Sequence, residues 1–237
     1  MKSHHTPPLL RLIDLLALVA ITAAFLLVVL YAPVELTMGS VQKVFYFHVA
    51  ASWTGMLGFL VATVAAIAYL KNSNLKWDIA SLAGIEIGMV FIALGIVSGS
   101  IWARPVWNTW WTWDPRLTTT LIMELVYAAY LLLRSGLDEP RRRARLAAVY
   151  AIVGFASVPL TFISIRVFRT IHPVLVGSSD PSAGTFAMSA RMQVAFFSSL
   201  AAFTTLFIAL YWHRYRLGKA QNEVERKRLE FEARGEA

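Results

Sequence analysis

The sequence of residues 102–120, WARPVWNTWWTWDPRLTTT, holds five of the eight tryptophans in the chain. They are Trp102, Trp107, Trp110, Trp111 and Trp113. Three of them have the i, i+3, i+4 spacing that would place them on one face of a helix. Asp114 followed by Pro115 is typical of a helix start, with Asp as the N-cap and Pro at the first helical position. We therefore expect a short helix or loop lying flat, followed by a longer helix that begins at Pro115.

A tryptophan cluster of this density has two explanations. Indole rings commonly gather at the headgroup level of a membrane. A flat aromatic surface flanked by Arg104 and Arg116 would also suit a large planar ligand that carries carboxylates. We favour the ligand, because five tryptophans within a dozen residues exceed what an interfacial belt usually contains.

The composition indicates an integral membrane protein. The chain is 57% hydrophobic and only 15% charged, whereas a soluble domain is about 25% charged. The net charge of +8 lies between apolar runs and forms no single patch, so we expect no nucleic-acid partner. Cysteine is absent, which excludes disulfides, thiolate chemistry and covalent haem attachment through CxxCH.

Six apolar runs are long enough to cross a membrane as helices. They cover approximately residues 9–31, 44–70, 79–102, 115–133, 146–168 and 192–212. The first is too long for the apolar part of a signal peptide, so we expect it to remain uncleaved. The sequence thus predicts an all-α, polytopic membrane protein. Its six-helix bundle occupies residues 1–213, and a charged cytoplasmic tail follows in residues 214–237, where alternating Glu and Lys or Arg indicate a solvated helix.

The basic residues give the expected orientation. With the N-terminus in the cytoplasm, the inner segments hold 16 of the 22 Lys and Arg residues, as the positive-inside rule requires. Both termini are then cytoplasmic. His48 lies at the outer end of the second run, the Trp-rich segment is an outer loop, and His172 lies in the last outer loop. Three separate features therefore converge on one face of the membrane.

This face has the side chains that haem needs. A single His near a membrane interface is usually a packing residue, but two on one side of an aromatic surface fit the axial ligands of haem iron. Zinc fits less well, since no third ligand has suitable spacing. Four arginines could pair with the haem propionates or, equally, with lipid phosphates. They are Arg104, Arg116, Arg166 and Arg169.

Three acidic residues have open roles. Asp114 could act only as an N-cap, or could accept a hydrogen bond from an indole or an arginine and so shape the aromatic surface. Glu86 and Glu124 lie inside predicted spans without an intrahelical cation. They could line a polar path, contact a partner subunit, or stay protonated within the bundle.

The segment RPVWNTWWTWDPRLTT resembles the WWD signature of the haem-handling proteins of cytochrome c maturation, the CcmC/CcmF/CcsA family. Six spans and a His on each side of the motif most resemble its CcmC branch, and the resemblance covers nearly the whole chain. The CcmF and CcsA-type haem lyases usually have more spans. The chain departs from the family at Asn108, where Gly often follows the first motif Trp. Asn tolerates unusual backbone angles, so the turn can persist.

The resemblance implies a haem-transfer protein of the bacterial inner membrane, not a conventional enzyme. Haem b would be held non-covalently on the periplasmic side, with His48 and His172 as axial ligands. Trp102, Trp107, Trp110, Trp111, Trp113 and Asp114 would form the platform. The resemblance also implies delivery to the haem chaperone CcmE, within a complex that contains the ABC subunits CcmA and CcmB and the small subunit CcmD.

Two other functions compete with this one. A two-haem cytochrome b needs His pairs within its spans, and the sequence has no His between residues 49 and 171. A cofactor-free channel or transporter subunit, with the tryptophans as an interfacial belt, stays open. A Soret band in the purified protein would favour the haem protein, and a colourless protein after haem supplementation would favour the channel.

Overall fold

The computed structural model of the chain describes residues 6–173 and 188–233. In this part all regular elements are helices, and one isolated bridge joins Glu35 to Gly39. Six helical spans are long and apolar enough to cross a membrane. The predicted all-α architecture with six transmembrane spans is therefore confirmed.

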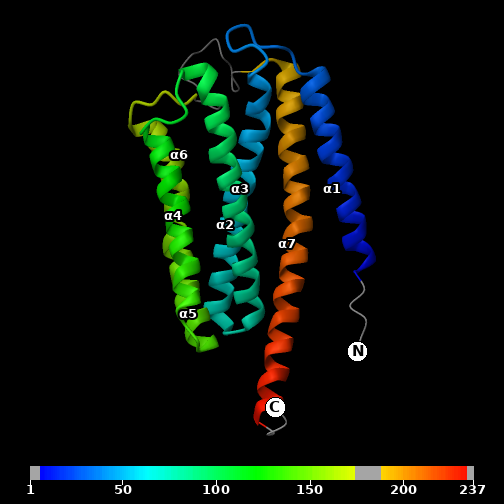
Figure 1. Cartoon of the computed structure of the whole chain (residues 1–237), viewed down its shortest axis with the longest axis vertical. Helices are drawn as coiled ribbons and strands as arrows, with labels where there is room; N and C mark the ends of the chain where they lie inside the picture. Colours follow the sequence, from blue (N-terminus) through cyan, green and yellow to red (C-terminus); the bar gives the residue numbers. More distant parts are fainter. Residues whose placement is uncertain (1–5, 174–187, 234–237) are drawn as a thin grey trace.

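The elements run along the chain as follows. They are α1 (Pro8–Leu26) with a π-helical continuation (Leu27–Tyr31), α2 (Gln42–Asn72), α3 (Leu75–Trp107), α4 (Pro115–Ser135), α5 (Pro140–Gly154), α6 (Ser157–Val167) and α7 (Ala190–Ala233). α5 and α6 together form the fifth span. Connections 32–41 and 108–114 and the end of α6 meet at the upper end of the bundle in Figure 1, and connections 73–74 and 136–139 lie at the lower end.

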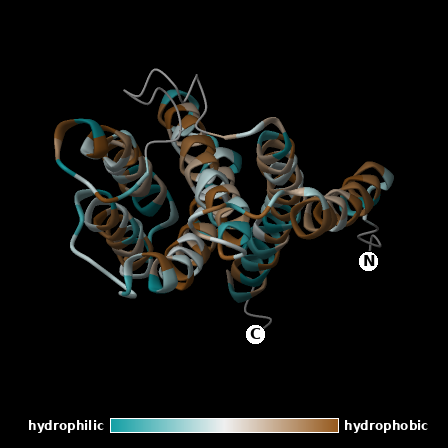
Figure 2. Ribbon diagram, turned by 90° about the horizontal axis from the view of Figure 1, so that it is seen from above, coloured by the Kyte–Doolittle hydropathy of each residue, from teal (hydrophilic) through white to brown (hydrophobic). Residues whose placement is uncertain are grey.

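The α2–α3 hairpin forms the centre of the bundle. α4, α5 and α6 lie on one side of it, and α7 and α1 lie on the other (Figure 1). Glycines bring the two helices close together: a Cβ atom on Gly58 would lie 2.7 Å from the carbonyl oxygen of Gly84. Small residues permit such backbone contact between transmembrane helices. The view along the bundle in Figure 2 shows apolar residues on the outward faces of the peripheral helices, as lipid contact requires.

Several helices extend beyond the apolar runs that predicted them. α3 continues past residue 102 to Trp107, through Pro105. α5 begins at Pro140, six residues before the apolar run, because Glu139 caps it by accepting a hydrogen bond from the backbone nitrogen of Arg141 (2.8 Å). Capping and proline placement therefore set these ends, and hydropathy alone does not.

The sixth span continues as a single helix into the charged tail. α7 ends at Ala233, beyond the apolar run that ends at residue 212, so the charged tail is helical as expected. Side chains four residues apart pair along the exposed extension, with Arg228 2.8 Å from Glu232 and Lys227 3.5 Å from Glu223. Such pairs each stabilise a helix slightly, which explains why the polar sequence stays helical.

Ion pairs join the helices away from the outer end. Arg134 of α4 contacts Asp78 of α3 through two hydrogen bonds of 2.5 and 2.9 Å. Arg214 of α7 donates to Glu86 of α3 at 2.9 Å, which gives Glu86 a cation from another helix. Glu124 keeps one buried carboxylate oxygen that has no hydrogen-bond partner among the described residues.

Candidate haem site

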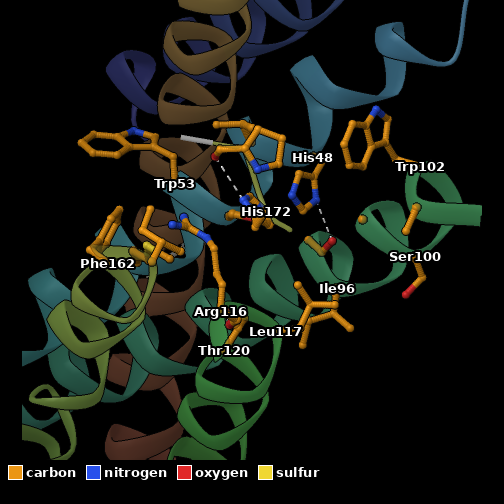
Figure 3. A pocket seen from close by; sticks show the side chains of 18 of the residues that line it. His48, Trp53, Ile96, Ser100, Trp102, Arg116, Leu117, Thr120, Phe162 and His172 are labelled. Atoms are coloured by element: carbon orange, nitrogen blue, oxygen red, sulfur yellow. Dashed lines mark hydrogen bonds between the residues drawn. The ribbon is translucent and has the colours of Figure 1, made fainter. Parts of the chain in front are cut away.

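A cavity of about 480 Å³ lies at the upper end of the bundle in Figure 1, between α2, α3, α4, α6 and α7. Cavities of about 300–1,000 Å³ are typical of sites for small molecules and cofactors. Both candidate histidines line it, together with residues of the Trp-rich segment (Figure 3). The three features that the sequence assigned to one face therefore meet around one cavity.

His48 occupies a fixed seat on the α2–α3 hairpin. Its Nδ1–H donates to the backbone carbonyl of Gly95 at 2.9 Å (Figure 3). The neighbouring Gly99 leaves room for the ring, because a Cβ atom there would lie 2.8 Å from Cε1 of His48. Since a carbonyl can only accept, this bond places the proton on Nδ1 and leaves the lone pair of Nε2 for a ligand.

His172 lies five residues beyond the end of α6, and its segment is tied to Asp114. Thr170 Oγ1 donates to Asp114 Oδ1 at 2.8 Å, and the backbone nitrogen of Ile171 donates to Asp114 Oδ2 at 2.9 Å. The predicted N-cap is also present, since Asp114 accepts from the backbone nitrogen of Arg116 at 3.0 Å. Asp114 is only 8% exposed. One buried carboxylate therefore caps α4 and holds the segment that carries His172.

The two imidazoles have a separation that suits one metal ion. Their ring centroids are 6.5 Å apart and their planes are inclined by 43°. Two imidazoles on opposite sides of one metal ion have ring centroids about 6.4 Å apart, given metal–nitrogen bonds of about 2.0–2.1 Å. Nδ1 of His172 faces the carbonyl of Pro173 at 3.3 Å, so Nε2 is again the free nitrogen. The separation of the pair matches that of the two axial imidazoles of a haem iron.

The electrostatic surroundings keep His172 neutral. Burial lowers its pKa to about 4, and the positive charge of Arg116 and the neighbouring His48 act in the same direction. The pKa of an ordinary His is about 6.5. At neutral pH the imidazole therefore has no proton to lose before it can bind a metal ion.

Four of the five tryptophans of the segment line the cavity: Trp102, Trp107, Trp110 and Trp111, which we call the tryptophan wall. Trp102 is buried and meets Trp107 edge to face at 5.0 Å between centroids, and Trp107 lies 6.4 Å from the ring of His172. Trp113 does not line the cavity. It is 74% exposed and supports Trp111 edge to face at 5.8 Å.

Residues 108–114, between α3 and α4, form a loop, so of the two expected arrangements the flat helix is absent. α3 ends at Trp107, and Asn108 takes a left-handed conformation with φ 56° and ψ 25°. Asn adopts this conformation more readily than most residues other than Gly, so the expected turn is present at Asn108. Arg104 fixes this turn, donating to the Asn108 carbonyl at 2.7 Å and to its side-chain oxygen at 2.5 Å. Helical spacing therefore does not explain how Trp110 and Trp111 reach the cavity.

The four candidate arginines fall into two pairs. Arg116 and Arg166 line the cavity, whereas Arg104 and Arg169 do not. The guanidinium of Arg116 lies over the ring of Phe162, 5.4 Å from its centroid. Arg116 and Arg166 are therefore placed to meet the carboxylates of a ligand in the cavity, and Arg104 serves the turn at Asn108.

Several lining residues were not predicted. Ser52 and Met56 follow His48 at i+4 and i+8 on α2, and Thr120 follows Arg116 at i+4 on α4. This helical spacing from residues already identified could have found them. Phe162 of α6 also lines the cavity, whereas Thr170 does not line it but donates to Asp114. Neither has such a signal, because each contact depends on how distant segments pack. Among the described residues, no group of three His, Cys, Asp or Glu side chains could hold a metal ion.

The comparisons with known proteins agree on one family. A model of the CcmC family, described as Heme exporter protein C, matches residues 3–230. The Heme exporter protein C of Bradyrhizobium diazoefficiens is 32% identical over 216 residues, covering 90% of this chain and 79% of that protein. Those of Haemophilus influenzae and Escherichia coli K12 are 30% identical over 200 residues (83% and 78% covered) and 31% identical over 142 residues (60% and 58%). The chain therefore belongs to the CcmC family.

Proposed function

We propose that this protein binds haem in the outer cavity, with His48 and His172 as the two axial ligands of the iron. The observation that carries the proposal is the 6.5 Å separation of the two imidazole centroids inside the cavity. Both rings have Nδ1 at a backbone carbonyl, which leaves Nε2 for the metal, as ligating histidines usually do.

The rest of the cavity suits the porphyrin and its propionates. The tryptophan wall offers apolar and aromatic surface to a flat macrocycle. Arg116 and Arg166 can pair with the two propionates, since a guanidinium binds a carboxylate through two parallel hydrogen bonds. The chain has no cysteine and so no thiol for a thioether link, which supports haem b held non-covalently as the cargo.

We further propose that the protein delivers this haem to the haem chaperone CcmE for the maturation of c-type cytochromes. The relatives are named Heme exporter protein C, and the WWD signature supports the same role. CcmA, CcmB and CcmD are the other subunits of the proposed complex. Non-covalent binding suits delivery, because haem held by aromatic contact and axial ligation can be released without breaking a bond to carbon.

The cavity faces the periplasm in this proposal, with both termini in the cytoplasm and the chain in the bacterial inner membrane. The excess of Lys and Arg in the inner segments supports it. In this cysteine-free chain, Trp113→Cys should react with a membrane-impermeant thiol reagent added to intact spheroplasts, and Arg142→Cys should react only after lysis. Labelling of Arg142→Cys in intact spheroplasts would reverse the orientation.

Haem content and haem delivery together test the proposed function. The full-length protein purified with its co-expressed partners should show a Soret band, and the chaperone from the same cells should carry haem. His48→Ala and His172→Ala should each change the spectrum and reduce haem on the chaperone. A protein that stays colourless after haem supplementation would instead support the cofactor-free channel.

A further inference from the structure

We propose that Asp114 is the positioning residue of His172, which deepens the proposed function and rests on it for the role of haem. Asp114 would then affect the iron by holding the segment after α6 that carries His172. It would not contact the porphyrin itself. Asp114 does not line the cavity, so its effect on a ligand there must pass through other residues.

The carboxylate of Asp114 accepts hydrogen bonds from two segments, the start of α4 and the segment after α6. Oδ1 accepts from the backbone nitrogen of Arg116 at 3.0 Å and from the hydroxyl of Thr170 at 2.8 Å. Oδ2 accepts from the backbone nitrogen of Ile171 at 2.9 Å. A carboxylate has enough lone pairs for all three bonds, whereas a neutral N-cap such as Ser has a single oxygen. The capping bond alone therefore does not require Asp at this position.

Thr170 carries the connection on to His172. Its hydroxyl has one proton, which it donates to Asp114, and the same oxygen accepts from the backbone nitrogen of His172 at 3.0 Å. Apart from the contact of His172 with the adjacent Pro173, the hydrogen bonds described for residues 170–172 lead to Asp114 directly or through Thr170.

The segment needs such an anchor because α6 has already ended. α6 stops at Val167, and Phe168 is extended with φ −108° and ψ 153°. His172 therefore has no helix to fix its ring, in contrast to His48 within α2. Since the carboxylate also caps α4, it fixes His172 relative to Arg116, the cation that lines the same cavity.

Asp114→Ser separates the two roles of the carboxylate. Ser is a good N-cap, so the start of α4 is kept while the bonds to Thr170 and Ile171 are lost. In the full-length protein loaded with haem, Asp114→Ser should convert the spectrum to that of His172→Ala, and Thr170→Val should do so in part. Glu139→Ser is the matched control, because Glu139 caps α5 at the opposite end of the bundle, and it should leave the spectrum unchanged.

Double variants distinguish positioning from a general loss of stability. Asp114→Ser should weaken haem affinity at least fivefold in the His48→Ala protein, where His172 is the remaining ligand. It should change the affinity less than twofold in the His172→Ala protein, where there is no ligand left to position. Equal losses in the two backgrounds would overturn the proposal.

A measurement without haem tests the proposal separately from the proposed function. His172→Cys in the haem-free protein should react at least fivefold faster with a water-soluble maleimide when Asp114→Ser is added, and Glu139→Ser should not change the rate. An unchanged rate with Asp114→Ser would overturn the positioning role. If the rate rises while neither His variant changes the haem spectrum, Asp114 positions residue 172 and the proposed bis-histidine haem site is wrong.

Discussion

The two histidines line the same cavity but are held in different ways, one within a helix and the other in a loop. His48 lies within a 31-residue helix. Its ring packs against α3, where it donates to the Gly95 carbonyl and fits into the space left by the lack of a side chain at Gly99. His172 lies beyond the end of α6 and is held through hydrogen bonds to one carboxylate. Moving the first ring means separating two packed helices, whereas moving the second means breaking a few hydrogen bonds.

This difference suits a protein that must load and release its cargo. A packed helix pair resists deformation, so His48 can keep its position while haem is absent. A loop segment opens at a lower cost in free energy than a packed core helix, so in the proposed haem site His172 would be the ligand that leaves first. The comparison gives each seat a separate set of expected variants.

Removing both rings should have the largest effect. We expect His48→Ala with His172→Ala to weaken haem affinity more than about 100-fold, beyond the 10–100-fold loss that is typical when an outer partner of a metal ligand is changed. Titration of the purified protein with haem measures it. The haem affinity of each single variant should lie between that of the double variant and that of the native protein. A double variant that binds haem as tightly as either single variant would mean that the rings do not act together.

Filling the space that the His48 ring occupies beside Gly99 should have the second largest effect on haem affinity. A Cβ atom at Gly99 would lie 2.8 Å from the ring, so Gly99→Ala should displace His48 and weaken haem affinity about 10–100-fold. The spectrum should resemble that of His48→Ala, not that of His172→Ala.

Gly136→Ala provides the matched control for this change. A Cβ atom at Gly136 would meet no atom closer than 3.8 Å, and this residue lies at the inner end of α4. Ala is a better helix former than Gly by about 1 kcal/mol, so loss of helix propensity cannot explain a defect in Gly99→Ala. Equal haem binding by both Ala variants would show that the seat is wider than the Cβ distance indicates.

The tryptophan wall should contribute less than either histidine seat. A stacked aromatic ring is worth about 1 kcal/mol beyond its buried area, or about fivefold in affinity. We expect the loss to be largest for Trp107→Ala, which removes the ring beside His172, and smaller for Trp110→Ala, because Trp110 is 59% exposed. Trp113→Ala is the internal control, since Trp113 does not line the cavity. Full haem occupancy in a triple variant of Trp107, Trp110 and Trp111 would make the wall an ordinary interfacial belt.

A decrease in pH should have the smallest effect on haem binding by His172. Its lowered pKa, about 4, means that the haem-free protein keeps this imidazole unprotonated well below pH 6.5. In the His48→Ala protein, haem affinity should therefore change less than about twofold between pH 7.5 and 5.5, where an imidazole with the ordinary pKa of about 6.5 would lose about tenfold. The variant without both histidines supplies the baseline for the haem propionates. A tenfold loss relative to that baseline would place His172 in water.

The sequence predicted the parts of this molecule that depend on local chemistry. Hydropathy located all six spans. Asp114 with Pro115 predicted the first residue of α4 correctly. The left-handed backbone at Asn108 agrees with the turn that the family resemblance implied and that Asn tolerates. These features are written in a few adjacent residues, so no knowledge of packing was needed.

The parts that the sequence did not predict depend on packing between distant segments. Nothing near Gly99 indicates that His48, 51 residues earlier, will lie against it. Thr170 and Asp114 are 56 residues apart, and their bond exists only because α4 and α6 pack side by side. The start of α5 at Pro140 was also missed, since the cap at Glu139 extends the helix beyond its apolar run. The helical tail of α7 was expected from its alternating charges.

Electron paramagnetic resonance of the full-length protein with ferric haem tests the bis-histidine site most directly. We expect a low-spin signal typical of two imidazole ligands, which becomes high-spin or changes its g values in both His48→Ala and His172→Ala. Added imidazole should restore the low-spin signal in His172→Ala at a lower concentration than in His48→Ala, because the packed helices enclose the seat of His48. A native signal that persists in both single variants would contradict the account, because the iron would then be held by other residues.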